Sequence, residues 1–220
     1  MPKGSVELIN ARKEEIMAAC KALYETMGFR DITIKDIAEK TSFTRTSIYN
    51  YFETKEEIFL AILQEEYELW IGDLNVLTEG HEIMDRDEVA GALAGSIDKR
   101  GLLLKLLSMN LYDMEENSRI ERLVEFKQAY GASIRAVDRL VGKFCPDMTE
   151  GERRQFLYTF FPFIYGIYPY TVVTEKQKTA MEQADVEFVY ISTYDMAYNG
   201  ARKLLGQARN ENRHMKDKAN

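Results

Sequence analysis

The sequence predicts an all-α fold with two helical domains. Apolar residues follow helical spacing over most of the 220 residues, and no segment shows a convincing alternation of polar and apolar residues at strand length. The chain has only four prolines, and its 45% hydrophobic content is enough for one small core and one larger core. We expect a three-helix helix-turn-helix domain over residues 1–54, a larger helical domain over 55–206 and a charged, flexible tail over 207–220.

A short helix is expected to begin just after residue 33. Thr33 followed by Asp36 is typical of an N-cap, because the hydroxyl accepts from free backbone N–H groups and the acid is favourable at the positive helix end. Ile34 and Ile37 then lie on one face, which we expect to be buried. After this helix the chain must turn, and Thr44 is placed to cap a second short helix.

The second short helix is expected to be buried on one side and polar on the other. Ile48 and Phe52 are four residues apart, so both face inward. Two short helices joined by a tight turn describe a helix-turn-helix whose second helix can lie in the major groove of DNA. The outer positions of that helix hold side chains that can form hydrogen bonds, namely Arg45, Thr46, Ser47, Tyr49 and Asn50.

A fourth, longer helix follows. Thr54 and Glu57 fit the S/T-x-x-E pattern of a capping box, which predicts a helix start at this point. The apolar pattern continues through Leu77 and stops at the Gly80-His81 break. A helix of this length can join both domains and serve as a lever between them.

The order of residues in this region resembles the DNA-binding domain of TetR-family transcriptional regulators. The resemblance covers about fifty residues, from a first helix expected over 11–29 through the run 34–63. Its matching pieces are Gly28-Phe29, Thr33, Ile37-Ala38, Ser47-Ile48-Tyr49, Tyr51-Phe52 and Lys55-Glu56-Glu57.

The resemblance implies two sets of DNA contacts. Arginine to guanine and asparagine to adenine can be bidentate, and each such pair carries about 1–3 kcal/mol of discrimination. A different interpretation makes Tyr49 and Tyr51 packing aromatics, and Lys35 or Arg45 ordinary solvated charges. The implied phosphate contacts are Thr33, Tyr49, Tyr51 and Lys55, and the implied base contacts are Lys35, Arg45, Thr46, Ser47 and Asn50.

The chain departs from the family pattern at three positions. Ser42 occupies the turn where family members often carry glycine, and a serine held at positive φ would cost about 1 kcal/mol. Thr46 stands where a small or rigid residue is frequent, and Asn50 where an aromatic or basic residue is common. The family pattern therefore does not determine the geometry of the turn at Ser42 or the role of Asn50.

The charge of the chain constrains how it can bind a nucleic acid. The net charge is −7, and residues 1–60 carry nine Lys and Arg against ten Asp and Glu, so −1 falls in this part and −6 in the remainder. Binding must then depend on a local basic patch and be sensitive to salt, which favours a dimer with two reading heads. The patch would comprise the N-terminal amine, Lys3, Lys35, Arg45 and Lys55.

The second domain is expected to consist of helices over 87–97, 102–109, 118–144 and 185–205, with one more in between. Pro146 should end the third of these, and Thr149 with Glu152 forms a capping box for the additional helix. That additional helix carries an aromatic run over 156–173, with Pro162 inside it.

The aromatic residues of the second domain have three interpretations. Plain core packing is the default. A dimer interface would use Phe161, Tyr168, Phe188, Ile191, Tyr194 and Tyr198. A cavity for an apolar or aromatic ligand would be lined by Trp70, Met109, Tyr112, Phe160 and Tyr165.

The sequence argues against enzymatic chemistry. The two histidines are His81 and His214, and no Ser/His/Asp, Cys/His or HExxH arrangement exists. Neither Cys20 nor Cys145 has a CxxC neighbour, so we expect no metal, no disulfide and no cofactor. Without a signal peptide or an apolar run of membrane-spanning length, the expected location is the cytoplasm.

The resemblance also implies a function. It implies a homodimeric repressor that binds a palindromic operator in double-stranded DNA and is released when a small-molecule effector enters the second domain. Release would require the effector to bind better to a form whose two reading helices are wrongly spaced. The alternative is a DNA-binding dimer that is controlled by a partner protein or acts as an activator, without small-molecule induction.

Overall fold

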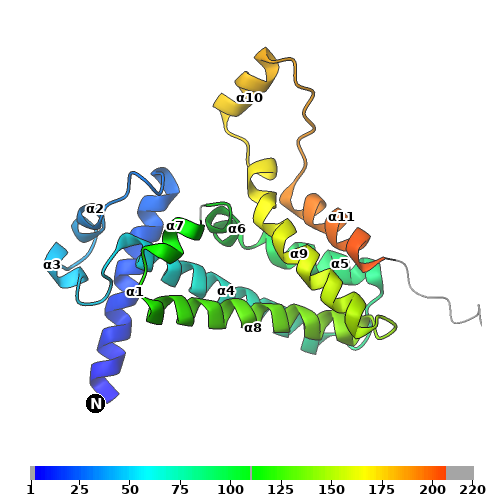
Figure 1. Cartoon of the computed structure of the whole chain (residues 1–220), viewed down its shortest axis with the longest axis horizontal. Helices are drawn as coiled ribbons and strands as arrows, with labels where there is room; N and C mark the ends of the chain where they lie inside the picture. The colour runs from blue at the N-terminus through cyan, green and yellow to red at the C-terminus, as the bar shows by residue number, and fades with distance from the viewer. Residues whose placement is uncertain (1–2, 110, 207–220) are drawn as a thin grey trace, which may run out of the picture. The chain divides into compact units, whose positions relative to one another are not determined.

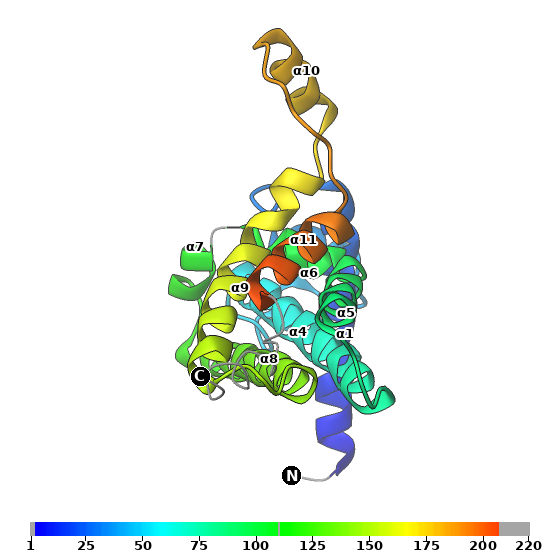
Figure 2. The same cartoon turned by 90° about the vertical axis from the view of Figure 1, so that its right-hand side faces the viewer.

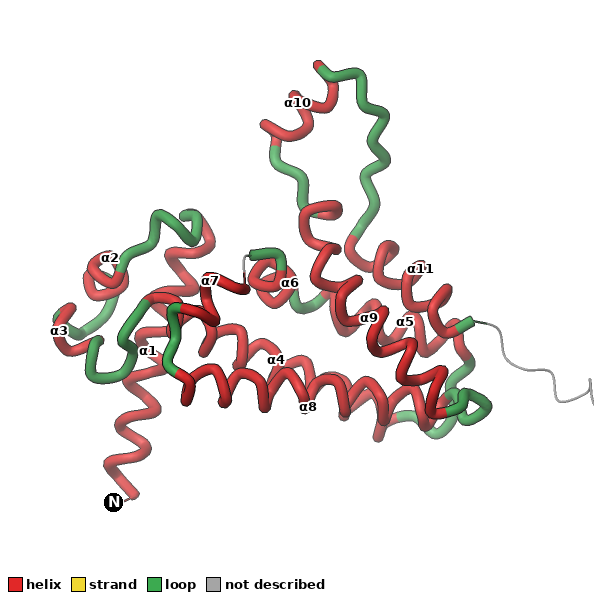
Figure 3. Tube along the Cα trace, viewed as in Figure 1, coloured by secondary structure: helices red, strands yellow, loops and turns green. Residues whose placement is uncertain are grey.

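The computed structural model describes residues 3–109 and 111–206, and every regular element in these residues is an α-helix (Figures 1 and 3). This confirms the all-α prediction. The predicted tail over 207–220 lies outside the described residues. The helices are α1 Lys3–Thr26, α2 Ile34–Glu39, α3 Arg45–Ile48, α4 Lys55–Gly80, α5 Arg86–Asp98, α6 Gly101–Leu107, α7 Leu111–Glu116, α8 Ile120–Phe144, α9 Glu150–Thr171, α10 Glu175–Gln183 and α11 Thr193–Leu205.

The chain forms two compact units whose limits differ from the predicted domain boundary at residue 54. The first unit contains residues up to 68 together with 109–131, and the second contains 69–108 together with the chain from 132 onward. Helices α4 and α8 each contribute to both units. A linear division could not anticipate this, because α7 and the start of α8 join the first unit through tertiary packing.

The first unit has a continuous apolar core. Ile37, predicted on the buried face of α2, is fully buried, as are Ile48 and Phe52 from the second short helix segment. Cys20 is also fully buried, and burial raises the pKa of its thiol to about 12. These observations confirm the predicted inward faces and make Cys20 a core residue.

Helix caps place the short helices of the first unit as predicted. Thr33 and Asp36 form a complete capping box at the start of α2, and the Thr44 hydroxyl accepts from the Ser47 amide at the start of α3. Ser42 does not adopt positive φ, because Asp185 is the one non-glycine residue with positive φ in the part of the chain that the structure describes. The expected strain at Ser42 is therefore wrong.

The second unit packs α11 against α5 and α9 (Figure 2). Gly200 allows the close approach of α11 to α9, since an added Cβ would lie 2.4 Å from ring atoms of Phe163. Trp70 is buried with its ring centroid 5.9 Å from that of Phe161. The predicted helices over 87–97, 102–109 and 118–144 are confirmed with shifts of one or two residues at most ends, and the Thr149 capping box starts α9.

The predicted helix over 185–205 is wrong in its first part. Residues 186–192 have no regular structure, Asp185 has φ of 54°, and α11 begins only at Thr193 after its N-cap Ser192 (Figure 3). Sequence analysis also missed α7 and α10. The Ser192 hydroxyl accepts from the Asp195 amide, so a local cap decides where the helix starts.

Within the described ranges, no single helix is long and apolar enough to cross a membrane. Helices α9 and α10 taken together pass the same test of length and composition, with a bend of 80° between them.

Candidate DNA-binding site

The candidate reading surface is built on the single turn of α3. Ile48 anchors the turn from inside, while Arg45, Thr46, Tyr49 and Asn50 are exposed. The hydroxyls of Thr44 and Ser47 are 2.9 Å apart and the Ser47 amide donates to Thr44 at 3.2 Å. Of the predicted base-reading side chains, Arg45, Thr46 and Ser47 thus lie on the capped helix, Asn50 lies in the turn that follows it, and Lys35 lies on α2.

Arg45 and Tyr49 form a pair on this surface. The Arg45 guanidinium donates to the Tyr49 hydroxyl at 3.2 Å, and its carbon lies 5.9 Å from the centre of the tyrosine ring. Such contacts limit the freedom of a long arginine side chain before it meets a ligand. Tyr49 is 42% exposed, so its ring is open to solvent as well as to Arg45.

The start of α2 has a different arrangement. The Thr33 hydroxyl donates to the Asp36 carboxylate at 2.6 Å, and this bond, with that from the Thr33 amide, lowers the pKa of Asp36. Lys35 is exposed and lies 3.8 Å from Glu39. An exposed pair of this kind holds its partners weakly, so Lys35 can turn to a phosphate or a base at little cost.

Lys55 is engaged within the protein. Its ammonium donates to the carbonyls of Phe29 at 2.8 Å and Ile32 at 3.0 Å, with Arg30 O at 3.4 Å, and it lies 4.5 Å from the centre of the Phe29 ring. These contacts tie the start of α4 to the connection between α1 and α2. The predicted phosphate contact would require the ammonium to leave these carbonyls.

Helix α1 fixes the turn between α2 and α3, which sequence analysis missed. The Ser42 amide donates to the Glu15 carboxylate at 2.6 Å, and this bond lowers the pKa of Glu15. The Arg12 guanidinium lies 4.8 Å from the centre of the Phe43 ring. Arg12 and Glu15 are three residues apart and so share one helix face, but nothing in the sequence tells which segment that face meets.

The residues predicted to line a ligand cavity are divided between the two units. Trp70 is fully buried and its indole donates to Ser96 at 2.9 Å, and Phe160 is stacked on Phe156 at 5.2 Å. Both are core residues here, so a ligand would have to replace their present neighbours. Tyr112 is 85% exposed on α7, whereas Tyr165 is half-buried on α9.

Met109 has a polar neighbour and borders a hollow. Its sulfur accepts from the Tyr24 hydroxyl at 2.9 Å. The hollow has a volume of about 400 Å³ and lies in the first unit between the end of α1 and α7. Its lining includes Asp31 and Asp113 as well as Arg30, so it is not the aromatic cavity that the sequence predicts.

The residues predicted for the dimer interface do not all lie on the surface of helices. Phe161, predicted at the interface, is 2% exposed and meets Phe160 edge to face, so its surface is already buried within its own chain. Phe188 and Ile191 lie in the irregular segment before α11 rather than on a helix. Tyr168 is half-buried, and burial raises its pKa. On α11, Tyr194 and Tyr198 are stacked at 6.1 Å.

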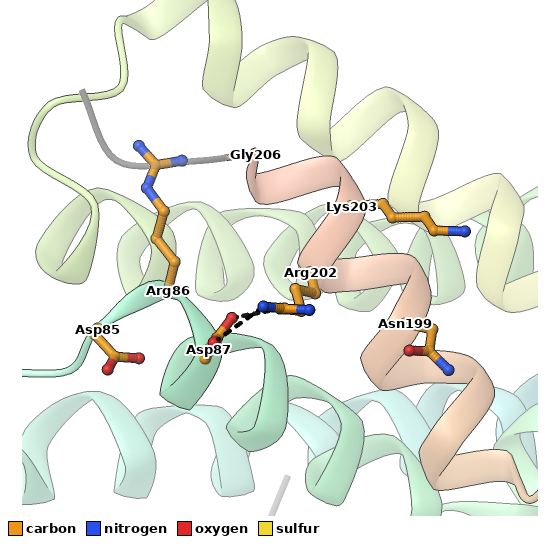
Figure 4. A pocket seen from close by; sticks show the side chains of 7 residues that line it. All are labelled: Asp85, Arg86, Asp87, Asn199, Arg202, Lys203 and Gly206. Atoms are coloured by element: carbon orange, nitrogen blue, oxygen red, sulfur yellow. Dashed lines mark hydrogen bonds and ion pairs between the residues drawn. The ribbon is translucent and has the colours of Figure 1, made fainter. Parts of the chain in front are cut away.

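A polar hollow lies between the start of α5 and the end of α11 (Figure 4). Its volume is about 560 Å³, and Arg202 crosses it to donate to Asp87 at 2.6 Å and 3.3 Å. Arg86 donates to Asp147 at 2.8 Å and to the Leu205 carbonyl. The Arg202 guanidinium is thus paired with Asp87, whereas the buried Nε of Arg86 has no hydrogen-bond partner among the described residues, and the charged lining does not suit an apolar effector.

No group of three or more His, Cys, Asp or Glu side chains within residues 3–109 and 111–206 could hold a metal ion. The described side chains therefore offer no metal centre. The outer face of α3 is the candidate binding surface, because its exposed polar side chains are held in place by the Thr44 cap and by the Arg45–Tyr49 hydrogen bond.

Comparison with known proteins agrees with this geometry. Residues 16–62 match the family model for bacterial regulatory proteins of the tetR family, and residues 64–193 match the tetracyclin repressor-like C-terminal domain. The uncharacterized HTH-type transcriptional regulator YfiR of Bacillus subtilis (strain 168) is 36% identical over 63 residues, which is 29% of this chain and 31% of the relative. The matched segments span about a third of the length of the curated relatives.

Solved structures show the same fold. A TetR/AcrR-family regulator from Thermobifida fusca gives a TM-score of 0.61 with 18% identity, covering 91% of this chain and all of that chain (100%). FadR from Bacillus subtilis in complex with stearoyl-CoA gives 0.57 with 16% identity, covering 90% and 99%. Since the two family models together cover most of the sequence, this chain belongs to the TetR family of transcriptional regulators, which are DNA-binding proteins and not enzymes.

Proposed function

We propose that the protein is a homodimeric repressor that binds a palindromic operator and is released from it by a small-molecule effector. The single observation that carries the DNA-reading part is the exposed, capped outer face of α3, with Arg45 held by Tyr49. A helix-turn-helix dimer reads two half-sites, and the symmetry of the operator then mirrors that of the protein. The proposed location is the cytoplasm.

The proposed contacts follow from exposure and chemistry. Phosphate contacts come from hydroxyl and ammonium groups, which place the protein on the duplex, and base contacts come from groups that reach the groove. Lys55 would join the phosphate contacts only after releasing the carbonyls of Phe29 and Ile32. The phosphate set is Thr33, Tyr49, Tyr51 and Lys55, and the base set is Lys35, Arg45, Thr46, Ser47 and Asn50.

Homodimerisation is supported by apolar surface on and between α9 and α11. Large apolar side chains left exposed on neighbouring segments are a common feature of protein interfaces. We propose that this surface meets a second copy of the chain, with Tyr168, Tyr194 and Tyr198 on helices and Phe188 and Ile191 on the segment before α11. Its exposed members are Tyr158 at 76%, Tyr170 at 57%, Val172 at 46%, Val186 at 52%, Val189 at 78%, Tyr190 at 55% and Tyr194 at 39%.

Acyl-CoA thioesters are the first effector class to test. The support comes from a structural neighbour, FadR from Bacillus subtilis, which was solved with stearoyl-CoA. The second unit of this chain is rich in aromatic and aliphatic side chains, which suits a long apolar group. Control by a partner protein, or activation without small-molecule induction, is the alternative.

Selection of bound DNA from a random pool tests the proposal. Wild type and Arg45→Ala/Tyr49→Ala would be run at two salt concentrations, with Arg154→Ala on the exposed Glu150 pair of α9 as the surface control. We expect wild type and control to enrich the same palindrome and the double variant to lose it. Enrichment of the same palindrome by the double variant would contradict reading by α3.

The recovered operator then allows a release test. Binding of the labelled operator would be followed by fluorescence anisotropy with added stearoyl-CoA, and with CoA and stearate as separate controls. Release by the thioester, but by neither control, would support an acyl-CoA effector. Stable binding in all three cases would favour the alternative without this effector class.

A further inference from the structure

An ion pair between a fully buried carboxylate and a partly exposed arginine joins the end of the helix-turn-helix to the start of α8. Glu57, the third residue of α4, has no exposed surface. The Arg119 guanidinium donates to it from Nε at 2.7 Å and from Nη2 at 2.7 Å, so the two side chains form a bidentate pair. The Arg119 amide at 3.1 Å and the Glu53 amide at 2.8 Å complete four donors around one carboxylate.

These bonds replace one half of the capping box that the sequence predicts. The Thr54 hydroxyl does accept from the Glu57 amide at 3.2 Å, which is one half of a capping box. The Glu57 carboxylate accepts from Glu53 rather than from Thr54, and it turns to Arg119. Burial tends to raise the pKa of Glu57, but the hydrogen bonds from Arg119 and Glu53 lower it overall, so the carboxylate is charged.

Neighbouring contacts join the same two segments. The Thr54 hydroxyl donates to the Asn117 carbonyl at 2.9 Å, and Arg122 donates to the Tyr51 carbonyl at 3.4 Å. Arg122 also lies 5.5 Å from the centre of the Phe52 ring. The residues that directly follow the reading helix are thus held by the residues around the start of α8, far away in the sequence.

We propose that Arg119 is a positioning residue for DNA reading: through Glu57 it fixes residues 51–57 and thereby the orientation of α3. The inference goes beyond the proposed effector and rests only on the reading role of α3. A buried carboxylate is costly without its partner, so α4 and the start of α8 must keep their register for the pair to persist. Arg119 directly precedes α8, and α8 runs on into residues that belong to the second unit.

A merely structural pair would act only on stability. Four variants separate the two roles: Arg119→Gln, Arg119→Lys, the double variant Glu57→Gln/Arg119→Gln, and the control Lys127→Gln. Lys127 pairs with Glu115 at 2.5 Å and also joins α8 to α7, but it does not contact residues 51–57 through this pair. The double variant removes the buried charge together with its partner, so it is expected to recover most of the unfolding temperature that Arg119→Gln loses.

The readouts are the unfolding temperature, the affinity for the selected operator relative to a scrambled duplex, and amide hydrogen exchange over residues 44–52. We expect the double variant to unfold near the wild-type temperature, yet to lose about tenfold or more in the operator-to-scrambled ratio, since a reading site tolerates only small displacements. Exchange over 44–52 should be faster than in wild type and in Lys127→Gln. Relative to Arg119→Gln, the variant Arg119→Lys should recover part of the operator-to-scrambled ratio and part of the slow exchange, because it keeps the charge but loses the bidentate geometry.

Wild-type operator ratio and wild-type exchange in the double variant would overturn the positioning role and leave a structural pair. Hydrogen exchange is measured on the free protein, so it also decides the matter if wild type selects no operator. In that case the proposed DNA-reading function fails, independently of Arg119. Unchanged amide exchange over residues 44–52 in the double variant would reject the positioning role of Arg119.

Discussion

The helix-turn-helix and the connection between α9 and α11 are both built from short helices, but they are held in opposite ways. Helix α3 has four residues and is fixed by Ile48 from inside and by the cap residue Thr44. None of the nine residues of α10, all of which the structure describes, is buried. A nine-residue helix is marginal by itself, so α10 depends on its cap and on few neighbours.

The connection is held by local contacts. Thr174 caps α10, the Val186 amide donates to the Met181 carbonyl at 3.0 Å, and the Lys178 ammonium lies 5.7 Å from the centre of the Tyr190 ring. Figures 1 and 2 show α10 and its flanking segments extending away from α9 and α11. A threonine cap starts both α3 and α10, which are described over their full length, but only α3 also has a buried side chain that attaches it to a core.

The largest effect is expected from the core below α3. Phe52→Ala should lower the free energy of unfolding by about 3–5 kcal/mol, because it removes a fully buried ring. Urea unfolding followed by circular dichroism would measure this. Tyr190→Ala in the connection, where the ring is 55% exposed, is the matched aromatic control and should change the value much less. Equal losses would contradict the comparison.

A second difference should appear on acidification. Hydrogen bonds from Arg119 and Glu53 outweigh burial and hold the pKa of Glu57 below its ordinary value, so its contribution to stability is present above that ordinary value and is lost as the pH falls through the lower folded pKa. The stability difference between wild type and Glu57→Gln should therefore shrink between pH 7 and pH 3. Glu175→Gln on α10, whose carboxylate is exposed, is the matched control. A constant difference for Glu57→Gln would refute this linkage.

Cap removal tests the comparison with identical chemistry. Thr44 and Thr174 each accept from a backbone amide at a helix start. Thr44→Ala should cost about 1 kcal/mol of global stability, as is typical for a cap, whereas Thr174→Ala should leave global unfolding unchanged and speed amide exchange only within α10. Comparable global losses would mean that α10 unfolds together with a core.

The smallest effect on folding is expected at Val189, which is 78% exposed. Val189→Ser should change the free energy of unfolding of the monomer by less than about 0.5 kcal/mol. If the connection meets a second copy of the chain, the same change should raise the dimer dissociation constant in analytical ultracentrifugation. The exposed position Val76 on α4 provides a valine control, and an equal effect of Val76→Ser would argue against an interface at the connection.

Local patterns in the sequence were sufficient for the helix-turn-helix. The caps at Thr33, Thr44 and Thr149 and the inward positions of Ile48 and Phe52 were predicted correctly, since each depends on residues three or four positions apart. The exposed placement of Arg45, Thr46 and Asn50 follows from the same periodicity. Their roles at bases stay predictions that the selection experiment addresses.

The positions of several aromatic and aliphatic residues in the second unit could not be predicted from helical spacing. Phe188 and Ile191 have helical spacing, yet they lie in an irregular segment because the cap at Ser192 starts α11 after them. Phe161 was assigned to a dimer interface, with core packing as the default, and it packs in the core of its own chain, since the spacing of a helix that is apolar on all sides does not tell which side meets its own chain.

The sequence by itself determined the all-α class, the positions of the two short helices of the helix-turn-helix and the family. Those properties are encoded by caps, periodicity and residue order within short windows. Only the tertiary structure decided that Glu57 completes no capping box but binds Arg119, that Lys55 holds carbonyls after α1, and that α4 and α8 each belong to two units. A charged side chain chooses among partners that are distant in sequence, and only the packed fold brings one of them within hydrogen-bond distance.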